Sequence, residues 1–180
     1  MPVDESPGAV LDMCVDTCAL VGRVAAGDRN ALESLYYCYY HRLAGFLSRS
    51  IGSRESVEEI INDTFIEVWR GAKDSREASL VASTWMFGIA YRKAFEYLCQ
   101  QRSRAAFSNT RRPVEQELGT MPFEERSTLV LAYQMRCSLE QIAAITGVPI
   151  GTVKARMLSA REKVSCFLPC HKDKPIGGDG

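Results

Sequence analysis

Apolar residues recur every three to four positions along most of this chain, which is the period of a helix with one buried face. The longest such stretch follows Asp28, whose side chain can cap a helix start, and it runs toward Ser50. Its apolar stripe comprises Leu32, Leu35, Tyr36, Tyr39, Leu43, Phe46 and Leu47. No stretch alternates apolar and polar residues with period two over a useful length. The sequence therefore predicts an all-α protein.

Six further helices are predicted from the same periodicity and from start and stop signals. They are expected at about 15–26, 57–70 and 85–102, after Pro122, at 139–146 and from 150 to about 168. The helix at 57–70 has the clearest start, because Ser56 and Glu59 have the spacing of a capping box. Gly27 is the expected end of the helix at 15–26, and Ser83 or Thr84 is the expected cap of the helix at 85–102.

The last quarter of the chain contains the pattern of a helix-turn-helix. Ser138 can cap the first helix, Gly147 can end it in the left-handed conformation, and Pro149 prevents it from continuing. A second helix then begins near Ile150. Its first turn would enter the major groove of DNA, and later basic residues would reach phosphates. From these residues alone, a plain helical hairpin with a solvated basic face is the alternative.

The pattern divides the chain into two small helical domains joined by a flexible linker. The predicted segments are an N-terminal tail (1–14), a first domain (15–102), a linker (103–119), a second domain with the helix-turn-helix (120–168) and a C-terminal tail (169–180). The linker is inferred from a change in character, because basic, polar and helix-breaking residues replace the apolar repeat.

The composition is that of a folded protein, with 46% hydrophobic and 24% charged residues. The formal net charge is zero, so DNA binding requires local basic patches and leaves acidic surface for other partners. The acidic start lacks the features of a signal peptide, and no apolar run approaches the length of a membrane helix. A cytoplasmic protein without direct membrane insertion is expected.

No set of residues indicates catalysis. The two histidines are His41 and His171, and the second lies in the predicted tail. No convincing nucleophile–base pair and no Gly-rich phosphate loop can be identified. The sequence therefore predicts a binding protein that is not an enzyme and requires no cofactor.

Seven cysteines, an odd number, argue against a complete disulfide framework and fit reduced thiols. Cys38, Cys99 and Cys137 fall at or beside apolar helix positions and are predicted to be buried and inert. Other cysteines form two pairs with the i, i+4 spacing that places two thiols on one helix face. The resulting candidates for a regulatory metal site or redox switch are Cys14, Cys18, Cys166, Cys170 and His171. This is not a familiar zinc spacing, so incidental thiols remain the alternative.

Five stretches within residues 20–164 carry a resemblance to a known family. They are residues 25–36, 58–70, 84–90 (Thr-Trp-Met-Phe-Gly-Ile-Ala), 118–126 and 150–156, the last continued by Ala160 and Arg161. In this order and spacing they resemble motifs of the extracytoplasmic-function (ECF) sigma factors, the smallest sigma subunits of bacterial RNA polymerase. The matching motifs are the opening helix, the core-polymerase-binding helix, the −10 helix, the entry to region 4 and the −35 helix.

The resemblance implies that the first domain (region 2) binds core RNA polymerase and the −10 element, and that the second (region 4) binds the −35 element. It assigns core binding to Glu59, Asn62, Asp63, Phe65 and Glu67. It assigns the −35 element to Ile150, Gly151, Thr152, Lys154, Arg156 and Arg161. It also implies control by an anti-sigma factor. From the residues alone, the carboxylates fit a solvated face.

Promoter melting requires side chains that capture bases of a separated strand, and stacking on an aromatic ring contributes about 1–3 kcal/mol per base. The candidates for the −10 element are Trp85, Tyr91, Arg92 and Lys93. Trp85 fits equally well as a core anchor at the start of its helix. Residues 91–93 depart from the family's common Arg-Asn pattern, so the resemblance does not define the −10 sequence preference.

Two other functions fit parts of the chain. A sigma-like mimic that occupies an anti-sigma factor would predict a degraded recognition helix, yet Gly-Thr-Val-Lys-Ala-Arg at 151–156 is intact. A stand-alone helix-turn-helix repressor would leave the acidic helix and the 84–102 helix without a purpose. The chain is therefore predicted to be an alternative sigma factor that binds core polymerase and directs promoter-specific initiation.

Overall fold

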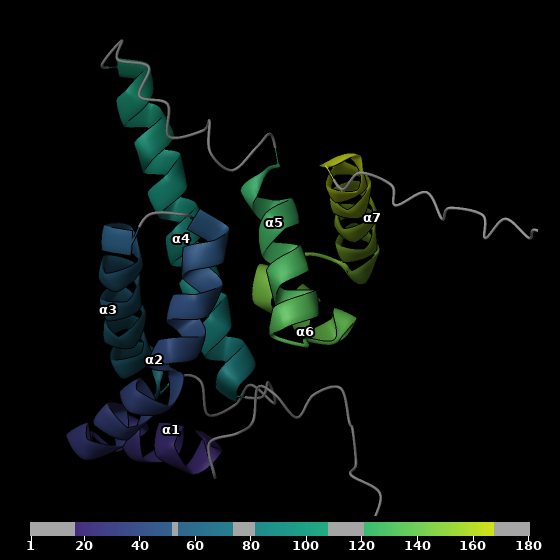
Figure 1. Cartoon of the computed structure of the whole chain (residues 1–180). Coiled ribbons are helices and arrows are strands. Elements are labelled where there is room, and N and C mark those ends of the chain that lie inside the picture. Colours follow the sequence, from purple (N-terminus) through teal and green to yellow (C-terminus); the bar gives the residue numbers. More distant parts are fainter. Residues whose placement is uncertain (1–16, 52–53, 74–81, 108–120, 168–180) are drawn as a thin grey trace, which may run out of the picture.

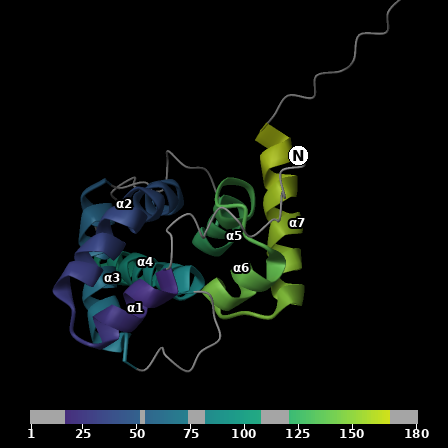
Figure 2. The same ribbon diagram turned by 90° about the horizontal axis from the view of Figure 1, so that it is seen from below.

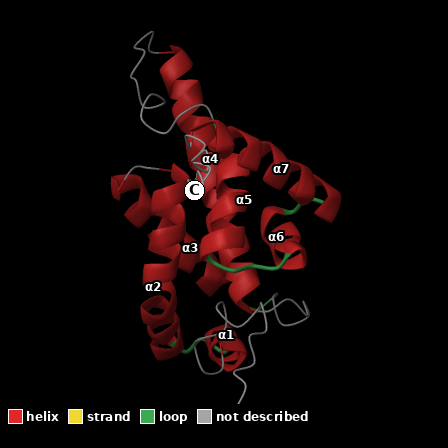
Figure 3. Ribbon diagram, turned by 45° about the vertical axis from the view of Figure 1, so that its right-hand side comes forward, coloured by secondary structure: helices red, strands yellow, loops and turns green. Residues whose placement is uncertain are grey.

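The structure, a computed structural model, describes residues 17–51, 54–73, 82–107 and 121–167. Its elements in chain order are α1 (Thr17–Ala25), α2 (Arg29–Ile51), α3 (Arg54–Gly71), α4 (Ala82–Phe107), α5 (Phe123–Leu129), the π-helical turn η2 (Val130–Gln134), α6 (Leu139–Thr146) and α7 (Ile150–Phe167). Every regular element in these residues is a helix (Figure 3), which confirms the all-α prediction. No described helix is both long and apolar enough to cross a membrane.

Helices α1–α4 form one bundle, and α5–α7 form a second group beside it (Figure 1). The two groups touch, since α4 packs against α6 and α2 packs against α5 (Figure 2). Buried apolar residues form one continuous cluster from Val21 on α1 to Val153 on α7. The described parts of both helical groups therefore share a hydrophobic core.

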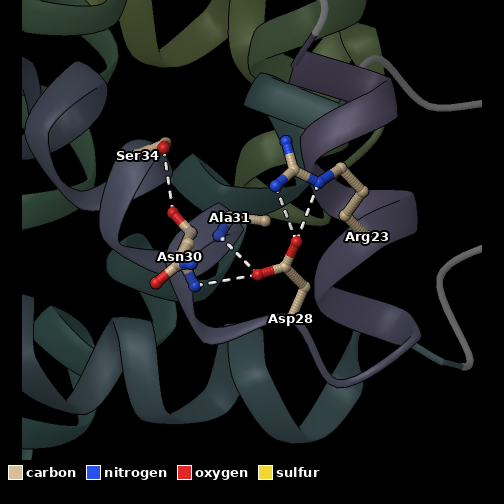
Figure 4. A network of polar contacts seen from close by, with 5 residues as sticks. All are labelled: Arg23, Asp28, Asn30, Ala31 and Ser34. Carbon is tan, nitrogen blue, oxygen red and sulfur yellow. Dashed lines mark hydrogen bonds and ion pairs between the residues drawn. The ribbon is translucent and has the colours of Figure 1, made fainter.

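The turn between α1 and α2 is fixed by Gly27 and Asp28, as the sequence predicted. Gly27 has a φ of 90°, which side chains other than glycine's rarely allow. The Asp28 carboxylate accepts hydrogen bonds from the amides of Asn30 and Ala31 at 2.9 and 3.3 Å, and it pairs with Arg23 at 2.6 Å (Figure 4). The hydrogen bond from Arg23 is the main cause that lowers the pKa of Asp28. This cap joins the two helices electrostatically as well as through the backbone.

The predicted capping box of α3 is wrong. The helix begins at Arg54, two residues before Ser56, so Ser56 lies inside its first turn. The Ser56 hydroxyl donates to the hydroxyl of Tyr97 on α4. The side chain that the local pattern assigned to the helix start therefore bonds to a residue of another helix.

The predicted limits of α4 are also wrong at both ends. The helix begins at Ala82, and the hydroxyls of Ser83 and Thr84 are buried without hydrogen-bond partners, so neither acts as its cap. At the other end it continues to Phe107, so residues 103–107 of the predicted linker are helical. The remaining linker residues, 108–119, lie outside the described residues.

The helix-turn-helix has the predicted cap and turn. Ser138 accepts a hydrogen bond from the Gln141 amide at 3.2 Å, and the Gln141 side chain accepts one from the Ser138 amide at 2.8 Å. This reciprocal pair is a capping box. Gly147 ends α6 with a φ of 70°. Pro149 directly precedes α7, and its carbonyl accepts the amide of Val153 at 3.1 Å.

The π-helical turn η2 between α5 and α6 was not predicted. The amide of Met135 bonds to the carbonyl of Val130 at 3.1 Å, five residues earlier, and Arg136 then takes a φ of 51°. Leu131 within this turn is fully buried, whereas Tyr133 is 59% exposed. The apolar spacing does not distinguish such a turn from continued α-helix, because only the hydrogen-bond partner changes.

Only one of the three cysteines predicted to be buried is buried. Cys137 is in the core, and burial raises the pKa of its thiol to about 12. Cys99 is an exposed free thiol, and Cys38 is exposed and disulfide-bonded. Both stand next to a stripe residue but face outward, because neighbouring positions on a helix point about 100° apart.

The proposed metal ligands fall mostly outside the described residues. Cys18 is an exposed free thiol on α1. The structure does not describe Cys14, Cys170, His171 or the side chain of Cys166. Within the described residues, no three His, Cys, Asp or Glu side chains are grouped so that they could hold a metal ion. The metal hypothesis therefore stays a prediction.

Candidate nucleic-acid interface

The outer face of α3 presents acidic and amide side chains to solvent. Glu59, Asn62 and Asp63 are exposed, and Ile66 beside them is 48% exposed. Their spacing of three and four residues places them on one side of the helix. We call these four residues the α3 face. It combines negative charge with an apolar side chain, a surface suited to a basic protein partner.

Phe65 is not part of the α3 face, contrary to the prediction. It is 5% exposed, and its ring centroid lies 5.0 Å from that of Tyr36 on α2. The side chain therefore packs α3 against α2 and contributes no surface for a partner. The motif placed Phe65 next to surface residues in the sequence, but the packing of α3 turns it toward the core.

Glu67 was predicted to bind core polymerase, but it forms ion pairs with two residues that were predicted to bind the −10 element. Its carboxylate pairs with Arg92 at 2.7 Å and with Lys93 at 3.1 Å, both on α4. Arg92 is 61% exposed, so this pairing is weak and can be exchanged for contacts with an anion. Glu96, on the same helix, also pairs with Lys93 at 3.9 Å, so two carboxylates balance the two cations in this cluster.

Trp85 is partly buried against the core and lines a cleft of about 270 Å³ between α4 and α6. Gly88 and Arg92 line the same cleft from α4, and residues 144–147 line it from α6. The helices approach closely here, since a Cβ on Gly88 would lie 3.5 Å from the carbonyl oxygen of Ile145. Trp85 thus both anchors its helix and borders a cavity.

Tyr91 is buried in this structure and is not presented to a DNA strand. It is 6% exposed, and its ring centroid lies 5.2 Å from that of Phe123, the first residue of α5. The pKa of Tyr91 is raised, mainly by burial, against the opposing effect of the Arg156 charge. The hydroxyl therefore stays protonated at neutral pH and lies among residues of α5 and α7.

The first turn of α7 is open to solvent. Ile150, Gly151, Thr152 and Lys154 are exposed, whereas Val153 is fully buried and holds the helix on the core. A recognition helix needs this division, with an anchored inner side and a free first turn for the major groove. Four of the six predicted −35 residues are therefore accessible together.

The two remaining −35 candidates lie farther along α7. Arg161 is exposed. Arg156 is only half-exposed, and its Nη1 atom is buried without a hydrogen-bond partner. Part of its guanidinium group is therefore turned away from solvent.

Polar contacts from α5 hold the middle of α7 in place. The Glu125 carboxylate accepts a hydrogen bond from the Ser159 hydroxyl at 3.0 Å and pairs with Lys163 at 2.6 Å. Ala160, which is fully buried, packs on the same side of α7. These contacts set the direction of the helix that presents the −35 candidates.

Sequence reasoning missed three residues at the junction of the two helical groups: Gly88, Phe123 and Arg126. The Arg126 guanidinium donates to the carbonyl of Ser50 at the end of α2 at 3.2 Å and to that of Met121 at 2.9 Å. Burial lowers its pKa. All three lie within the motif stretches 84–90 and 118–126, but these stretches do not reveal their role, because their partners lie on distant segments.

Sigma-70 family models match both helical groups. The sigma-70 region 2 model matches residues 35–104, and the sigma-70 region 4 model matches residues 111–164. The first range includes α3 and most of α2 and α4, and the second includes α5, η2, α6 and nearly all of α7. The fold is therefore that of a sigma-70-type factor.

Curated relatives define the group more closely. The ECF RNA polymerase sigma-E factor of Escherichia coli (strain K12) is 29% identical over 174 residues, covering 81% of this chain and 90% of that protein. The factor of the same name from Haemophilus influenzae is 27% identical over 175 residues, covering 81% and 92%. The chain belongs to the ECF sigma factors.

Two solved structures have a similar arrangement. CnrH, in complex with the cytosolic domain of CnrY, matches with a TM-score of 0.65 and 25% identity, covering 83% of this chain and 94% of CnrH. The sigma factor RpoE of Bartonella quintana, in complex with the anti-sigma factor NepR, matches with a TM-score of 0.63 and 19% identity, covering 78% and 98%. The second likeness shows the fold alone.

Proposed function

We propose that this ECF sigma factor binds core RNA polymerase and directs it to promoters through contacts with the −10 and −35 elements. The observation that carries the proposal is the solvated first turn of α7 on an intact helix-turn-helix, in a chain that also has the region 2 helices. A sigma factor performs no chemistry of its own; it positions the polymerase. The cytoplasm, where polymerase and DNA meet, is the proposed location.

Core polymerase is proposed to dock on the α3 face. Glu59, Asn62 and Asp63 are accessible and unshielded by other helices of the described chain. Charge complementarity with a basic partner increases the association rate and fixes orientation. Glu67 is proposed to act differently, by orienting Arg92 and Lys93 for DNA, because it already pairs with both.

The −10 element is proposed to bind along α4, with Arg92 and Lys93 on the backbone and Trp85 beside the separated strand. An arginine or lysine contact to phosphate positions the strand, and an aromatic ring can stack on an unpaired base. The cleft next to Trp85 offers space at that point. Tyr91 is available only if α5 moves away from α4.

Control by an anti-sigma factor is proposed from the two structural relatives, each of which was solved with a protein partner. A sigma-like mimic remains the second candidate. The two candidate functions make different demands on α7, because a sigma factor needs an accessible and correctly anchored recognition helix and a mimic does not. We favour the sigma factor because both features are present here.

The test is transcription in vitro with core RNA polymerase of the source organism across a promoter library. The sigma factor should bind core and select a common pair of promoter elements. Asp63→Lys should weaken core binding at least tenfold, whereas Glu33→Lys, on α2 and outside the α3 face, should not. Failure to bind core or to direct initiation would overturn the proposal; binding of an anti-sigma factor alone would identify a mimic.

Contacts to the −35 element are tested separately. Lys154→Ala should reduce −35-dependent initiation severalfold and leave core binding unchanged, because the side chain lies on the exposed side of α7. Glu162→Ala, exposed on the same helix, is the matched control. Equal loss of core binding in the Lys154 variant would remove this residue from the DNA surface.

Regulation by metal or oxidation is a further proposal from the cysteine pairs. It is supported only by the i, i+4 spacing and by the exposure of Cys18. Initiation should then respond to zinc, copper or oxidant, and Cys166→Ser combined with Cys170→Ser should abolish the response. An identical response in the double variant would show that these thiols are incidental.

A further inference from the structure

The cleft between α4 and α6 has the size and the lining of a site for a small flat ligand. It measures about 270 Å³ and lies where the two helices pack together (Figure 2). Its α4 side includes Thr84, Trp85, Gly88 and Arg92, and its α6 side is formed by residues 144–147. Cavities that hold drug-sized molecules measure roughly 300–1,000 Å³. This cleft is therefore large enough for a group of one or two rings.

The spacing of residues along α4 shapes the cleft. Trp85 and Arg92 are seven residues apart, so they lie on the same side of the helix, about 10 Å apart along its axis. Gly88 stands between them, and a Cβ at this position would lie 3.5 Å from the carbonyl oxygen of Ile145. A ring in the cleft can therefore reach Trp85, Arg92 and the backbone of α6 together.

The end of α6 supplies hydrogen-bond acceptors. Gly147 ends the helix with a φ of 70°, and its amide bonds to the carbonyl of Ala143 at 2.9 Å. The last carbonyls of a helix have no amide partner within the helix, and they carry partial negative charge. Residues 144–146 belong to this last turn and line the cleft. The α6 side therefore favours a ligand with N–H donors.

Arg92 supplies donors from the α4 side. Its Nη2 atom donates to the Glu67 carboxylate at 2.7 Å, and a guanidinium group has further N–H groups for a ligand. Glu67 and Glu96 balance the charges of Arg92 and Lys93. A ligand is therefore held here by hydrogen bonds and stacking and not by a net positive charge.

Thr84 adds a hydroxyl group that lacks a partner. The residue is 3% exposed, and its Oγ1 atom forms no hydrogen bond within the described residues. A buried hydroxyl without a partner is unfavourable. Because Thr84 lines the cleft, a polar atom of a ligand can pair with this hydroxyl.

We propose that this cleft binds the base of a free guanine nucleotide, stacked on Trp85. Guanine has two acceptors, O6 and N7, on the edge that arginine recognises in DNA. Its N1–H and N2–H₂ donors lie on the next edge and suit the carbonyls of α6. Adenine, cytosine and thymine each lack one or both of these pairs. The proposal does not depend on promoter binding, although a bound guanine would compete with the −10 strand for Trp85.

The test is a titration of the free full-length protein with guanosine monophosphate (GMP), followed by ¹H–¹⁵N NMR. The chain has two tryptophans and so gives two indole cross-peaks, which Trp69→Phe assigns. GMP should shift the Trp85 peak and leave the Trp69 peak in place, with a dissociation constant of roughly 0.1–1 mM for a group of this size. A Trp85 peak that stays in place at about 10 mM GMP overturns the site.

Two variants locate the ligand. Ala144→Leu should weaken GMP binding severalfold, because Ala144 lines the cleft and the added atoms narrow it; Ala155→Leu, exposed on α7, is the matched control. Arg92→Gln should weaken binding roughly tenfold, whereas Arg29→Gln, exposed at the start of α2, should not. Circular dichroism verifies that each variant is folded. Unchanged binding in folded Ala144→Leu or Arg92→Gln overturns this placement.

Other ligands test which part of the nucleotide is recognised. Guanosine should bind about as tightly as GMP, and the adenine and cytosine nucleotides should bind roughly tenfold more weakly. Equal affinity for all three nucleotides overturns recognition of guanine, and a requirement for the phosphate overturns recognition of the base. Much tighter binding of a five-nucleotide single strand with one central guanine overturns the free nucleotide as the ligand and assigns the cleft to a DNA strand.

Discussion

Single side chains fix both ends of α6 and so the geometry of the turn before the recognition helix. Ser138 and Gln141 satisfy amide groups that a helix start leaves unpaired, and Gly147 supplies the left-handed residue that ends the helix. Because α7 starts three residues after Gly147, an error in this turn would change the direction of α7. Local backbone chemistry thus determines where the predicted −35 residues point.

Ser138→Ala should lower the free energy of unfolding by about 1 kcal/mol, the usual loss when an N-cap side chain is removed. Urea denaturation followed by circular dichroism measures the change. Ser48→Ala, at an exposed position within α2, is the control and should cause no comparable loss. Equal stability of the Ser138 variant and the wild type would contradict the capping role.

Cys137 should resist alkylation by iodoacetamide at pH 8 in the native protein, while Cys18 and Cys99 react. Burial raises its pKa from 9.0 to about 12, and the thiolate is the reactive form. Mass spectrometry after labelling, with and without urea, identifies the modified thiols. Because the folded state retains this proton longer, the stability that it contributes is complete below pH 9 and is lost as the pH rises toward 12. Native labelling of Cys137 at the rate of Cys99 would disprove its burial.

The arrangement of whole helices depends on a few contacts between elements. Glu125 of α5 holds α7 through Ser159 and Lys163, and Phe65 of α3 packs on Tyr36 of α2. The first pair orients the recognition helix, and the second orients the α3 face by turning its aromatic residue inward. At this scale, each proposed binding surface is the outer side of a helix whose inner side is fixed by such a contact.

A double-mutant cycle with Glu125→Gln and Lys163→Met should give a coupling energy of roughly 1 kcal/mol. The value lies at the upper end for ion pairs near a surface, because Glu125 is only 15% exposed. Urea denaturation of the four proteins supplies the cycle. Glu162→Gln is the reference for removing a charge from the exposed side of α7. Additive single effects would show that the pair does not hold the two helices together.

At the scale of the whole molecule, the packing of α5 and α6 on α2 and α4 leaves some of the predicted DNA-binding residues accessible and buries others. The first turn of α7 is exposed, whereas Tyr91 is buried against Phe123 and Nη1 of Arg156 is buried. The exposed cations of α7 should therefore determine how DNA binding depends on salt.

The salt dependence of −35 duplex binding should be less steep for Lys154→Ala than for the wild type. Each phosphate contact contributes about 0.9 to the log–log slope, and this variant removes an exposed cation from α7. Fluorescence anisotropy across a potassium chloride series measures the slope. Tyr133→Ala, which removes an exposed ring and no charge, is the control and should leave the slope unchanged. Equal slopes for Lys154→Ala and the wild type would show that Lys154 makes no phosphate contact.

The helices, the turn at Gly27 and Asp28, and the helix-turn-helix could be predicted because local chemistry determines them. A cap, a left-handed glycine and a 3.6-residue apolar period act over one or two turns of helix, and neighbouring residues carry the whole signal. Where a side chain bonds to or packs on a residue far away in the sequence, the same signals gave a wrong prediction. Ser56 bonds to Tyr97 and does not cap α3, and Phe65 packs on Tyr36.

By itself, the sequence determined that the protein is all-α, that its last quarter contains a helix-turn-helix, and which helix carries each candidate surface. Only the tertiary structure decided which candidates are accessible. Tyr91 and Phe123 lie 32 positions apart, and nothing near either residue specifies the other. Their ring contact arises because α5 and α6 pack onto α2 and α4. Which residues are buried depends on how the whole chain packs, and the local sequence pattern does not encode this.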